Sequence, residues 1–260
     1  MKEAYRYIDE NTDKFWRIEC EGNFLVVNYG KTNSTGKYQL KEFANIDECE
    51  KEAKKLIDSK VKKGYKLYLD FPYDNHLYFD DDEIGIHPLT SHPNFRKAFT
   101  DEFYYNCTEE ASPFGSDDGS DTLYTIYNDI RKNEHLDFTN LSKKLVEKFF
   151  GMKYVNPENI SNTIDQLKKC KNGELNFIDT DMVTYFDFNT SLMVTYATAF
   201  AQIKITGRID EKLKVTALHS IPAIANESFD WDYLVLKEVS EILLKATSDL
   251  EKFQIYTSKE

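Results

Sequence analysis

A chain of 260 residues is long enough for one large domain or for two modest ones, and we expect two. Apolar residues make up 41% of it and charged residues 30%, which excludes a disordered chain and indicates a folded protein with a sizeable core. The first residues lack the apolar stretch of a secretory signal, and no run approaches the roughly 18 apolar residues that a membrane span needs. We therefore expect a cytoplasmic protein without a membrane partner.

The net charge of −12 is unevenly distributed along the chain. Residues 1–68 hold 14 Lys and Arg against 12 Asp and Glu, which leaves 19 against 33 for residues 69–260. Binding to a nucleic-acid backbone depends on Lys and Arg that displace counterions from phosphates. We therefore expect any contact with nucleic acid to come from the first part of the chain, and a contact with a protein partner to come from the acidic second part.

The first part of the chain predicts a small sheet with one helix. Short segments of alternating or continuous apolar residues are separated by turn-forming residues, as in a strand meander. From Asp47 the apolar residues fall on a single helical stripe, and Gly64 can take the left-handed conformation that ends a helix. The strands are expected at 16–20, 24–29, 37–43 and 65–69.

The same region contains four motifs in a fixed order: Phe15-Trp16-Arg17-Ile18, Asn28-Tyr29-Gly30-Lys31, Gly36-Lys37-Tyr38 and Lys60-Val61-Lys62-Lys63-Gly64-Tyr65. Their order and spacing resemble the WGR module, a small curved sheet with one helix. That module is known from DNA-end-sensing ADP-ribosyltransferases and from bacterial proteins of unclear role. We expect a WGR-like domain at residues 1–70.

In that family a Trp-Gly-Arg turn places a ring and a guanidinium near the terminal sugar and phosphate of a broken strand. The resemblance implies that Tyr29, Gly30 and Lys31 take these places, although tyrosine stacks less surface and lysine cannot contact a phosphate through two parallel hydrogen bonds. The alternative is that Tyr29 and Lys31 merely flank a tight turn. The predicted nucleic-acid contacts are Tyr29, Lys31, Lys37, Lys60 and Lys63.

Residues 71–91 predict a linker or arm, and residues 92–260 a mostly helical acidic domain, so the fold class is α+β. The motif His92-Pro93-Asn94-Phe95, together with the acidic run from Ser112 to Leu123, resembles the YfeS-type bacterial proteins. This resemblance implies no particular reaction. Residues 192–205 suit a helix or a strand, and we favour a helix. The other helices are expected at 123–130, 141–149, 157–167 and 231–246.

Two groups of residues in this second part suggest a cation site. Asp117, Asp118 and Asp121 supply the oxygen ligands that Ca²⁺ or Mg²⁺ prefers, but their spacing does not match a calcium-binding loop, and a turn that caps the following helix is the favoured interpretation. His87 and His92 each precede a proline and resemble part of a metal or acid-base site, but no third ligand follows at a defined spacing. We therefore assign no metal.

No nucleophile, phosphate-loop or metalloprotease motif occurs in the chain. The four cysteines form no Cys-x-x-Cys pair and have no histidine at ligand spacing, so we expect free thiols and no cofactor. The favoured hypothesis is a non-catalytic binding protein that contacts a nucleic-acid end or a protein. The first alternative is a protein-interaction or immunity-type factor without nucleic-acid binding, and the second is a metal-dependent hydrolase that uses Asp117, Asp118, Asp121 and the two histidines.

Overall fold

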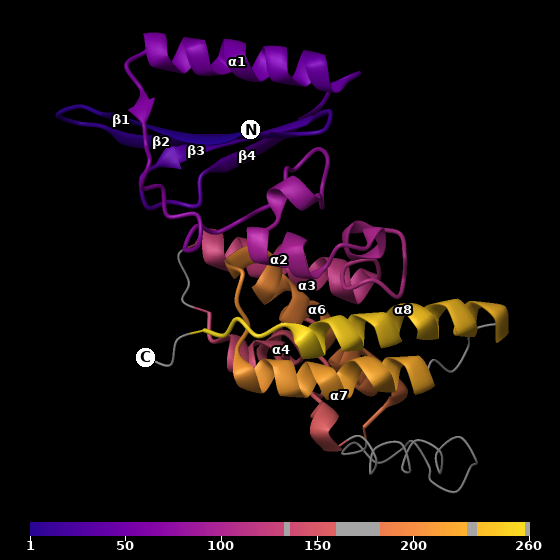
Figure 1. The fold of residues 1–260 in the computed structure, drawn as a ribbon. Helices are drawn as coiled ribbons and strands as arrows, with labels where there is room; N and C mark the ends of the chain where they lie inside the picture. Colours follow the sequence, from indigo (N-terminus) through magenta and orange to yellow (C-terminus); the bar gives the residue numbers. More distant parts are fainter. Residues whose placement is uncertain (133–135, 160–182, 228–232, 258–260) are drawn as a thin grey trace, which may run out of the picture. The chain divides into compact units, whose positions relative to one another are not determined.

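The computed structural model describes all residues except 133–135, 160–182, 228–232 and 258–260 (Figure 1). The chain divides into two compact units. The first unit comprises Met1–Arg96 with Lys204–Thr206, and the second comprises Lys97–Ile203 with Gly207–Glu260. The segment predicted as a linker or arm, residues 71–91, therefore belongs to the first unit.

The first unit is built on a five-stranded antiparallel sheet in the order β4-β3-β2-β1-β5. One helix, α1 (Ile46–Lys62), packs on one face of this sheet (Figure 1). This arrangement confirms the predicted fold class and the predicted helix. The strands are β1 (Lys2–Ile8), β2 (Asp13–Glu21), β3 (Phe24–Lys31), β4 (Lys37–Glu42) and β5 (Lys66–Leu67).

The α1 side of the sheet holds the main apolar core of this unit. Side chains of β2 and β3 that point to this side pack against Cys49 and Ala53 of α1, both of which are fully buried. The apolar stripe of the helix thus has the role that its spacing predicts. The core consists of Tyr5, Trp16, Ile18, Cys20, Leu25, Val27, Cys49 and Ala53.

The opposite side of the sheet is covered as well, so β2 is buried on both faces rather than half-buried as its alternation predicts. Phe71 packs against Ala4 and Phe15 on this side. The hydroxyl of Tyr38 donates to the carbonyl of Leu77 at 2.8 Å. The cover is residues 71–96, which include the short helix η1 (Pro88–Thr90) and the start of α2 (Pro93–Ala98).

One backbone amide on the outer edge of β4 is paired with a side chain. Asp81 is 8% exposed, and its carboxylate accepts a hydrogen bond from the backbone N–H of Leu40 at 3.0 Å. The same carboxylate accepts from the backbone N–H groups of Glu83 and Ile84 at 2.8 and 3.1 Å. One acidic residue of the cover thus satisfies three backbone donors.

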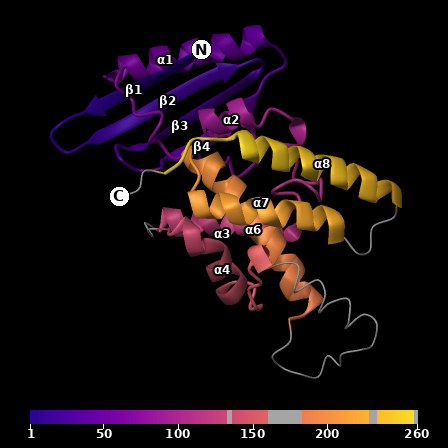
Figure 2. The same ribbon diagram turned by 60° about the horizontal axis from the view of Figure 1, so that its bottom comes forward.

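The described part of the second unit is mainly helical, as predicted. Residues 192–205 lie within one long helix, which confirms the preference for helix over strand. The two last helices lie side by side in both views (Figures 1 and 2). The elements are η2 (Glu102–Tyr105), α3 (Asp117–Arg131), α4 (Phe138–Lys148), η3 (Pro157–Asn159), α6 (Tyr185–Thr206), α7 (Glu211–Glu227) and α8 (Tyr233–Lys252).

The longest of these helices, α6, has a well-defined start and end. Thr184 and Asp187 form a capping box at its start, and Gly207 ends it in the left-handed conformation with φ 68°. Helix α7, which carries Pro222 in its interior, was not among the helices predicted from the sequence. The predicted stripe beyond residue 159 and the predicted opening of the last helix at 228–232 lie outside the described residues. No helix in the described part of the chain is both long and apolar enough to cross a bilayer.

Candidate nucleic-acid interface

The residues aligned with the WGR turn lie at the end of β3, directly before the turn at 32–36. Gly36 has φ 69°, and a Cβ built on it would lie 2.7 Å from the ring of Phe15. A Cβ on Gly30 would lie 2.8 Å from the Cα of Gly36. Both positions therefore require glycine, because the two backbone segments pass too close for a side chain.

The strand register places three lysines on the side of the sheet that carries α1. Tyr29 pairs with Trp16 on one side and with Lys37 on the other, and Lys31 pairs with Lys14. Residues directly opposite each other in an antiparallel pair share a face, and Trp16 belongs to the core beneath α1. Lys14, Lys31 and Lys37 are exposed and project from this side of the sheet. Lys14 is not among the contacts predicted from the sequence.

The C-terminal end of α1 brings two further lysines to the same place. The Nζ atom of Lys60 lies 5.3 Å from the centre of the Trp16 ring, 5.9 Å from that of Tyr29 and 5.0 Å from that of Tyr65. Burial, and secondly the charge of Lys63, lowers the pKa of Lys60. Lys63 is the exposed C-cap residue of α1. The helix end therefore lies beside the Tyr29 ring, which is half-buried against the core.

We call Lys14, Lys31, Lys37, Lys60 and Lys63 the lysine patch. Its members come from β2, β3, β4 and α1. Within the described residues, no ion pair links any member of the patch to a carboxylate. The patch therefore presents uncompensated positive charge beside an aromatic ring. Four of the five predicted contacts are members of it, and Tyr29 is the fifth.

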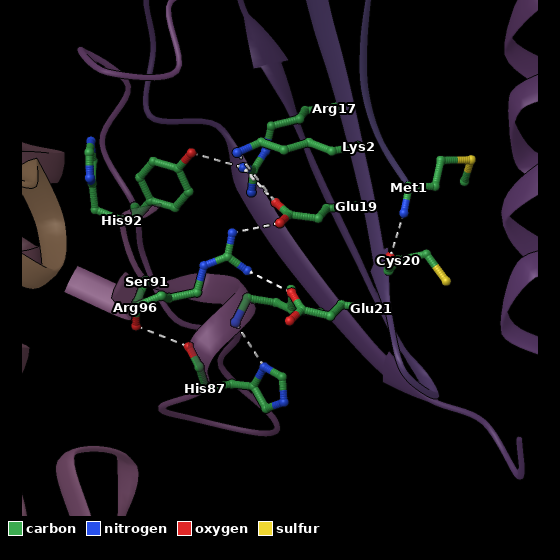
Figure 3. A network of polar contacts seen from close by, with 12 residues as sticks. Met1, Lys2, Arg17, Glu19, Cys20, Glu21, His87, Ser91, His92 and Arg96 are labelled. Carbon is green, nitrogen blue, oxygen red and sulfur yellow. Dashed lines mark hydrogen bonds and ion pairs between the residues drawn. The ribbon is translucent and has the colours of Figure 1, made fainter. Parts of the chain in front are cut away.

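The opposite side of the sheet also carries cations, but these are paired with one buried carboxylate (Figure 3). Glu19 is 5% exposed, and it accepts from Nη2 of Arg96 at 2.6 Å. Its other oxygen lies 3.4 Å from Nη1 of Arg17 and 3.9 Å from Nζ of Lys2. Burial lowers the pKa of Lys2, although Glu19 acts in the opposite direction. We call Lys2, Arg17, Glu19 and Arg96 the Glu19 cluster.

Arg17 is the most deeply buried member of the Glu19 cluster. Its side chain is 0% exposed, its Nη1 donates to the hydroxyl of Tyr78 at 3.0 Å, and its guanidinium lies 4.8 Å from the centre of that ring. Its Nε and Nη2 have no hydrogen-bond partner among the described residues. A buried, incompletely paired charge of this kind is costly, so the packing around it must hold it in place.

A second buried contact joins the cover to the turn after Lys31. Nε2 of His76 lies 2.6 Å from Oδ1 of Asn28, and Nδ2 of Asn28 donates to the carbonyls of Thr35 and Lys37 at 3.2 and 3.3 Å. Because the amide nitrogen faces two carbonyls, Oδ1 is the acceptor and Nε2 of His76 carries the hydrogen. Burial, followed by the charge of Arg17, lowers the pKa of His76 to about 3. The neutral histidine therefore supports the turn from the covered side.

The two histidines before prolines serve local turns. Nδ1 of His87 accepts from the backbone N–H of Leu89 at 3.1 Å, and Nδ1 of His92 accepts from that of Asn94 at 3.1 Å. The ring of His87 also packs against Phe24, with 4.5 Å between ring centres. Both contacts occupy Nδ1, one of the two ring nitrogens through which a histidine can bind a metal.

The acidic motif lies at the start of α3. The hydroxyl of Ser116 accepts from the backbone N–H of Gly119 at 3.1 Å, and Asp117 and Asp118 occupy the first turn, where carboxylates favour the helix dipole. Burial raises the pKa of Asp118. Asp121 is exposed one turn further on. These aspartates and the two histidines belong to different units, and the described residues contain no group of three or more His, Cys, Asp or Glu placed to hold a metal ion.

Comparisons with known proteins agree with a WGR domain in the first unit. The WGR domain model matches residues 1–72. The uncharacterised protein YfeS of Escherichia coli is 45% identical over 221 residues, which cover 85% of this chain and 86% of that protein. The chain belongs to the YfeS family. Protein YehF of E. coli is 42% identical over 59 residues, which cover 23% of this chain and 22% of YehF. A crystal structure of a Bacteroides fragilis protein is 31% identical to this chain. The match covers 40% of this chain and 31% of the B. fragilis chain, with a TM-score of 0.27.

Proposed function

We propose that the WGR domain of this chain binds a nucleic-acid end through Tyr29 and the lysine patch, and that the protein catalyses no reaction. The acidic remainder would then contact a protein partner. The observation that carries this proposal is the position of Lys60 over the rings of Trp16, Tyr29 and Tyr65. That position joins the end of α1 to the residues aligned with the family's Trp-Gly-Arg motif.

The lysine patch supplies the main term in the binding free energy. Each lysine that contacts a phosphate releases condensed counterions, and the affinity of such a contact falls steeply as salt rises. The Tyr29 ring offers a surface on which the terminal sugar or base can stack. No member of the patch is paired with a carboxylate in the described structure, so its exposed members Lys14, Lys31, Lys37 and Lys63 are available to phosphates.

The charge of the rest of the chain restricts where a polyanion can bind. Residues 69–260 hold 33 acidic side chains against 19 basic ones. A phosphate backbone is repelled by such a surface at low ionic strength. Binding is therefore expected to be confined to an end or a short segment that the lysine patch alone can cover, rather than to extend along a long duplex.

The test is a fluorescence anisotropy titration of the full chain with nicked, blunt and single-stranded DNA at two salt concentrations. The expected result is saturable binding at micromolar protein and low salt, with preference for DNA that has an end or a nick. A variant with Lys31→Gln and Lys37→Gln should weaken this binding, whereas Lys51→Gln should not, because Lys51 lies on α1 about 14 Å before Lys60 at 1.5 Å per residue. If the anisotropy does not rise with any of these DNAs at low salt, the proposed nucleic-acid binding is wrong.

The second candidate function is a protein-interaction factor whose acidic part contacts a basic surface. The uneven charge distribution favours it, because complementary charge accelerates and directs such association. Zero-length coupling of carboxylates to lysines, applied to the full chain in cells, would test it. The expected cross-links join carboxylates of residues 97–257 to one basic partner. Cross-links that arise only from residues 1–96 would contradict this assignment.

A further inference from the structure

Residues 76–81 form a segment, which we call the strap, that joins two distant parts of the first unit. The strap contacts β3 and β4 beside the turn at 32–36, and it also contacts Lys204–Thr206, the last three residues of α6. All of these residues belong to the first unit. The WGR domain model ends at residue 72, so neither the strap nor the end of α6 is part of the match.

On one side the strap holds the turn and the strands beside it. Its backbone and two of its side chains make hydrogen bonds to β3 and β4, before and after the turn at 32–36. Lys31 and Lys37 flank this turn, so these bonds help to position both ammonium groups. The bonds join Nε2 of His76 to Oδ1 of Asn28 at 2.6 Å, the carbonyl of Leu77 to the hydroxyl of Tyr38 at 2.8 Å, and the carboxylate of Asp81 to the backbone N–H of Leu40 at 3.0 Å.

On the other side the strap holds the end of α6 through a buried ion pair. Nζ of Lys204 lies 2.7 Å from Oδ1 of Asp80, and the two side chains are 0% and 9% exposed. The backbone N–H of Tyr78 donates to the carbonyl of Ile205 at 3.0 Å. That carbonyl is one of the last four in the helix, which have no partner within the helix itself. The strap therefore completes the end of α6 while α6 supplies the positive charge beside Asp80.

Burial of the ion pair makes the strap sensitive to the position of Lys204. A buried carboxylate that loses its partner is strongly unfavourable, and contact with water relieves the cost. Phe79 and Asp81 on either side of Asp80 are buried as well, so Asp80 reaches bulk water when the strap leaves the sheet. That movement breaks the bonds of the strap to β3 and β4. The ion pair and the support of the turn are therefore expected to be lost together.

We propose that the Lys204–Asp80 ion pair controls the order of the turn that Lys31 and Lys37 flank. When the pair is formed, the strap holds the turn in the arrangement described above; when the pair breaks, the strap and the turn open together. The end of α6 is thereby coupled to the lysine patch through contacts that lie within the first unit. Such coupling is reciprocal, so a ligand that orders the turn also stabilises the ion pair. This inference goes beyond the proposed function, and its test needs no nucleic acid.

Hydrogen exchange of the full chain, followed by mass spectrometry of its peptides, tests this coupling. In Lys204→Met, peptides that cover 28–42 and 76–92 should exchange roughly tenfold faster or more than in the parent, because the strap and the turn open as one local unit. Peptides that cover α1 should stay within about twofold of the parent. Lys245→Met is the matched control, since Lys245 also pairs with an aspartate but its side chain is 48% exposed.

Two further variants distinguish coupling from general damage to the fold. In the double variant Lys204→Met and Asp80→Asn no uncompensated carboxylate remains, so exchange of 28–42 should return to within about threefold of the parent. Thr90→Val removes only the hydrogen bond that the Thr90 hydroxyl donates to Asp80 at 2.6 Å. This milder change should speed exchange of 28–42 by about threefold, and it keeps the test open if Lys204→Met does not fold.

Each outcome either supports or overturns the coupling. Faster exchange that is confined to 76–92, with 28–42 unchanged, overturns it, because the strap would then open without the turn. An equal rise in every peptide of residues 1–96 also overturns it, since the pair would then stabilise the whole unit rather than the turn. Faster exchange of 28–42 that the double variant reverses supports it. That result would stand even if no DNA binds the parent, in which case the proposed function alone fails.

Discussion

The two faces of the sheet in the first unit use cations in opposite ways. On the α1 side, five lysines from four elements remain exposed or partly exposed, without carboxylate partners in the described structure. On the covered side, Arg17, Arg96 and Lys2 converge on the single carboxylate of Glu19. The lysines of the first arrangement are available to a ligand, whereas the cations of the second are already paired within the folded protein. Exposure and pairing, rather than the number of cations, therefore distinguish a binding surface from a structural cluster.

The largest expected effect comes from Glu19→Gln. It removes the only carboxylate that pairs with Arg17 in the described structure and leaves Arg96 with Glu21 alone. The loss of one partner from a buried ion pair costs about 3–5 kcal/mol in the free energy of unfolding. Urea unfolding followed by Trp16 fluorescence, in a Trp231→Phe background, measures this loss. At a temperature where the variant is still folded, its affinity for DNA should equal that of the parent. A loss of affinity without a loss of stability would mean that the Glu19 cluster takes part in binding.

The next effect concerns His76→Gln and acid. The pKa of His76 is about 3 in the folded state and about 6.5 when unfolded, so the folded state binds fewer protons between these values. The stability that His76 contributes is complete above pH 6.5 and is lost as the pH falls, by about 1.4 kcal/mol per pH unit. Between pH 6.5 and 4.5 the parent should lose about 2 kcal/mol more than the glutamine variant. Parallel pH profiles of the two proteins would contradict the assignment of a buried neutral histidine.

Gly36→Ala tests the turn between β3 and β4. The new Cβ would meet Phe15 at 2.7 Å and Nδ2 of Asn28 at 2.8 Å, and φ 69° is unfavourable for alanine. A cost of about 1–3 kcal/mol in unfolding free energy is expected. Because the turn positions Lys31 and Lys37, affinity for DNA should fall at the same time. Gly22→Ala is the matched control, since it shares a positive φ of 59° but would meet nothing within 4 Å.

The double variant Lys31→Gln and Lys37→Gln should leave stability within about 0.5 kcal/mol, since both residues are exposed. Its affinity should depend less on salt, with the slope of log affinity against log salt reduced by about 0.9 for each duplex phosphate that the variant no longer neutralises. The expected reduction is therefore about 1.8. An unchanged slope would show that these lysines do not contact phosphates.

The smallest expected effect is a gain from Lys31→Arg. A guanidinium can contact a phosphate through two parallel hydrogen bonds, which an ammonium cannot do. An increase in affinity of up to about tenfold is expected, with no change in unfolding free energy. The same substitution at Lys51 should have no effect on either quantity. Weaker binding by Lys31→Arg would indicate that the phosphate lies elsewhere on the patch.

Much of the fold follows from the sequence because its signals are local. The helix α1, the strands β2 to β4 and the helical character of 192–205 are encoded in apolar spacing over a few residues. β1 is harder to detect, since only Ala4 and Tyr5 of its seven residues are buried. The fold class could thus be predicted, but the number of strands could not.

The candidate site was only partly predictable, because its decisive contacts join distant residues. Lys14 carries no signal in the sequence, and only the strand register places it opposite Lys31. Arg17 has the alternation of a solvent-facing residue, yet it is fully buried because residues 71–96 cover that side. The Glu19 carboxylate beside Arg17 also binds Arg96, which is 77 residues away in the sequence. No local sequence pattern predicts a contact over that separation.

The carboxylate of Asp81 on the Leu40 amide has a consequence for the behaviour of this protein in concentrated solution. A sheet grows into fibrils by pairing at an open edge, where free backbone amides recruit a second molecule. At β4 a negative side chain already occupies that position and would repel the carbonyl oxygens of an incoming strand. Replacing Asp81 would therefore free the Leu40 amide, and we expect this edge of β4 to pair more readily with a strand of a second molecule.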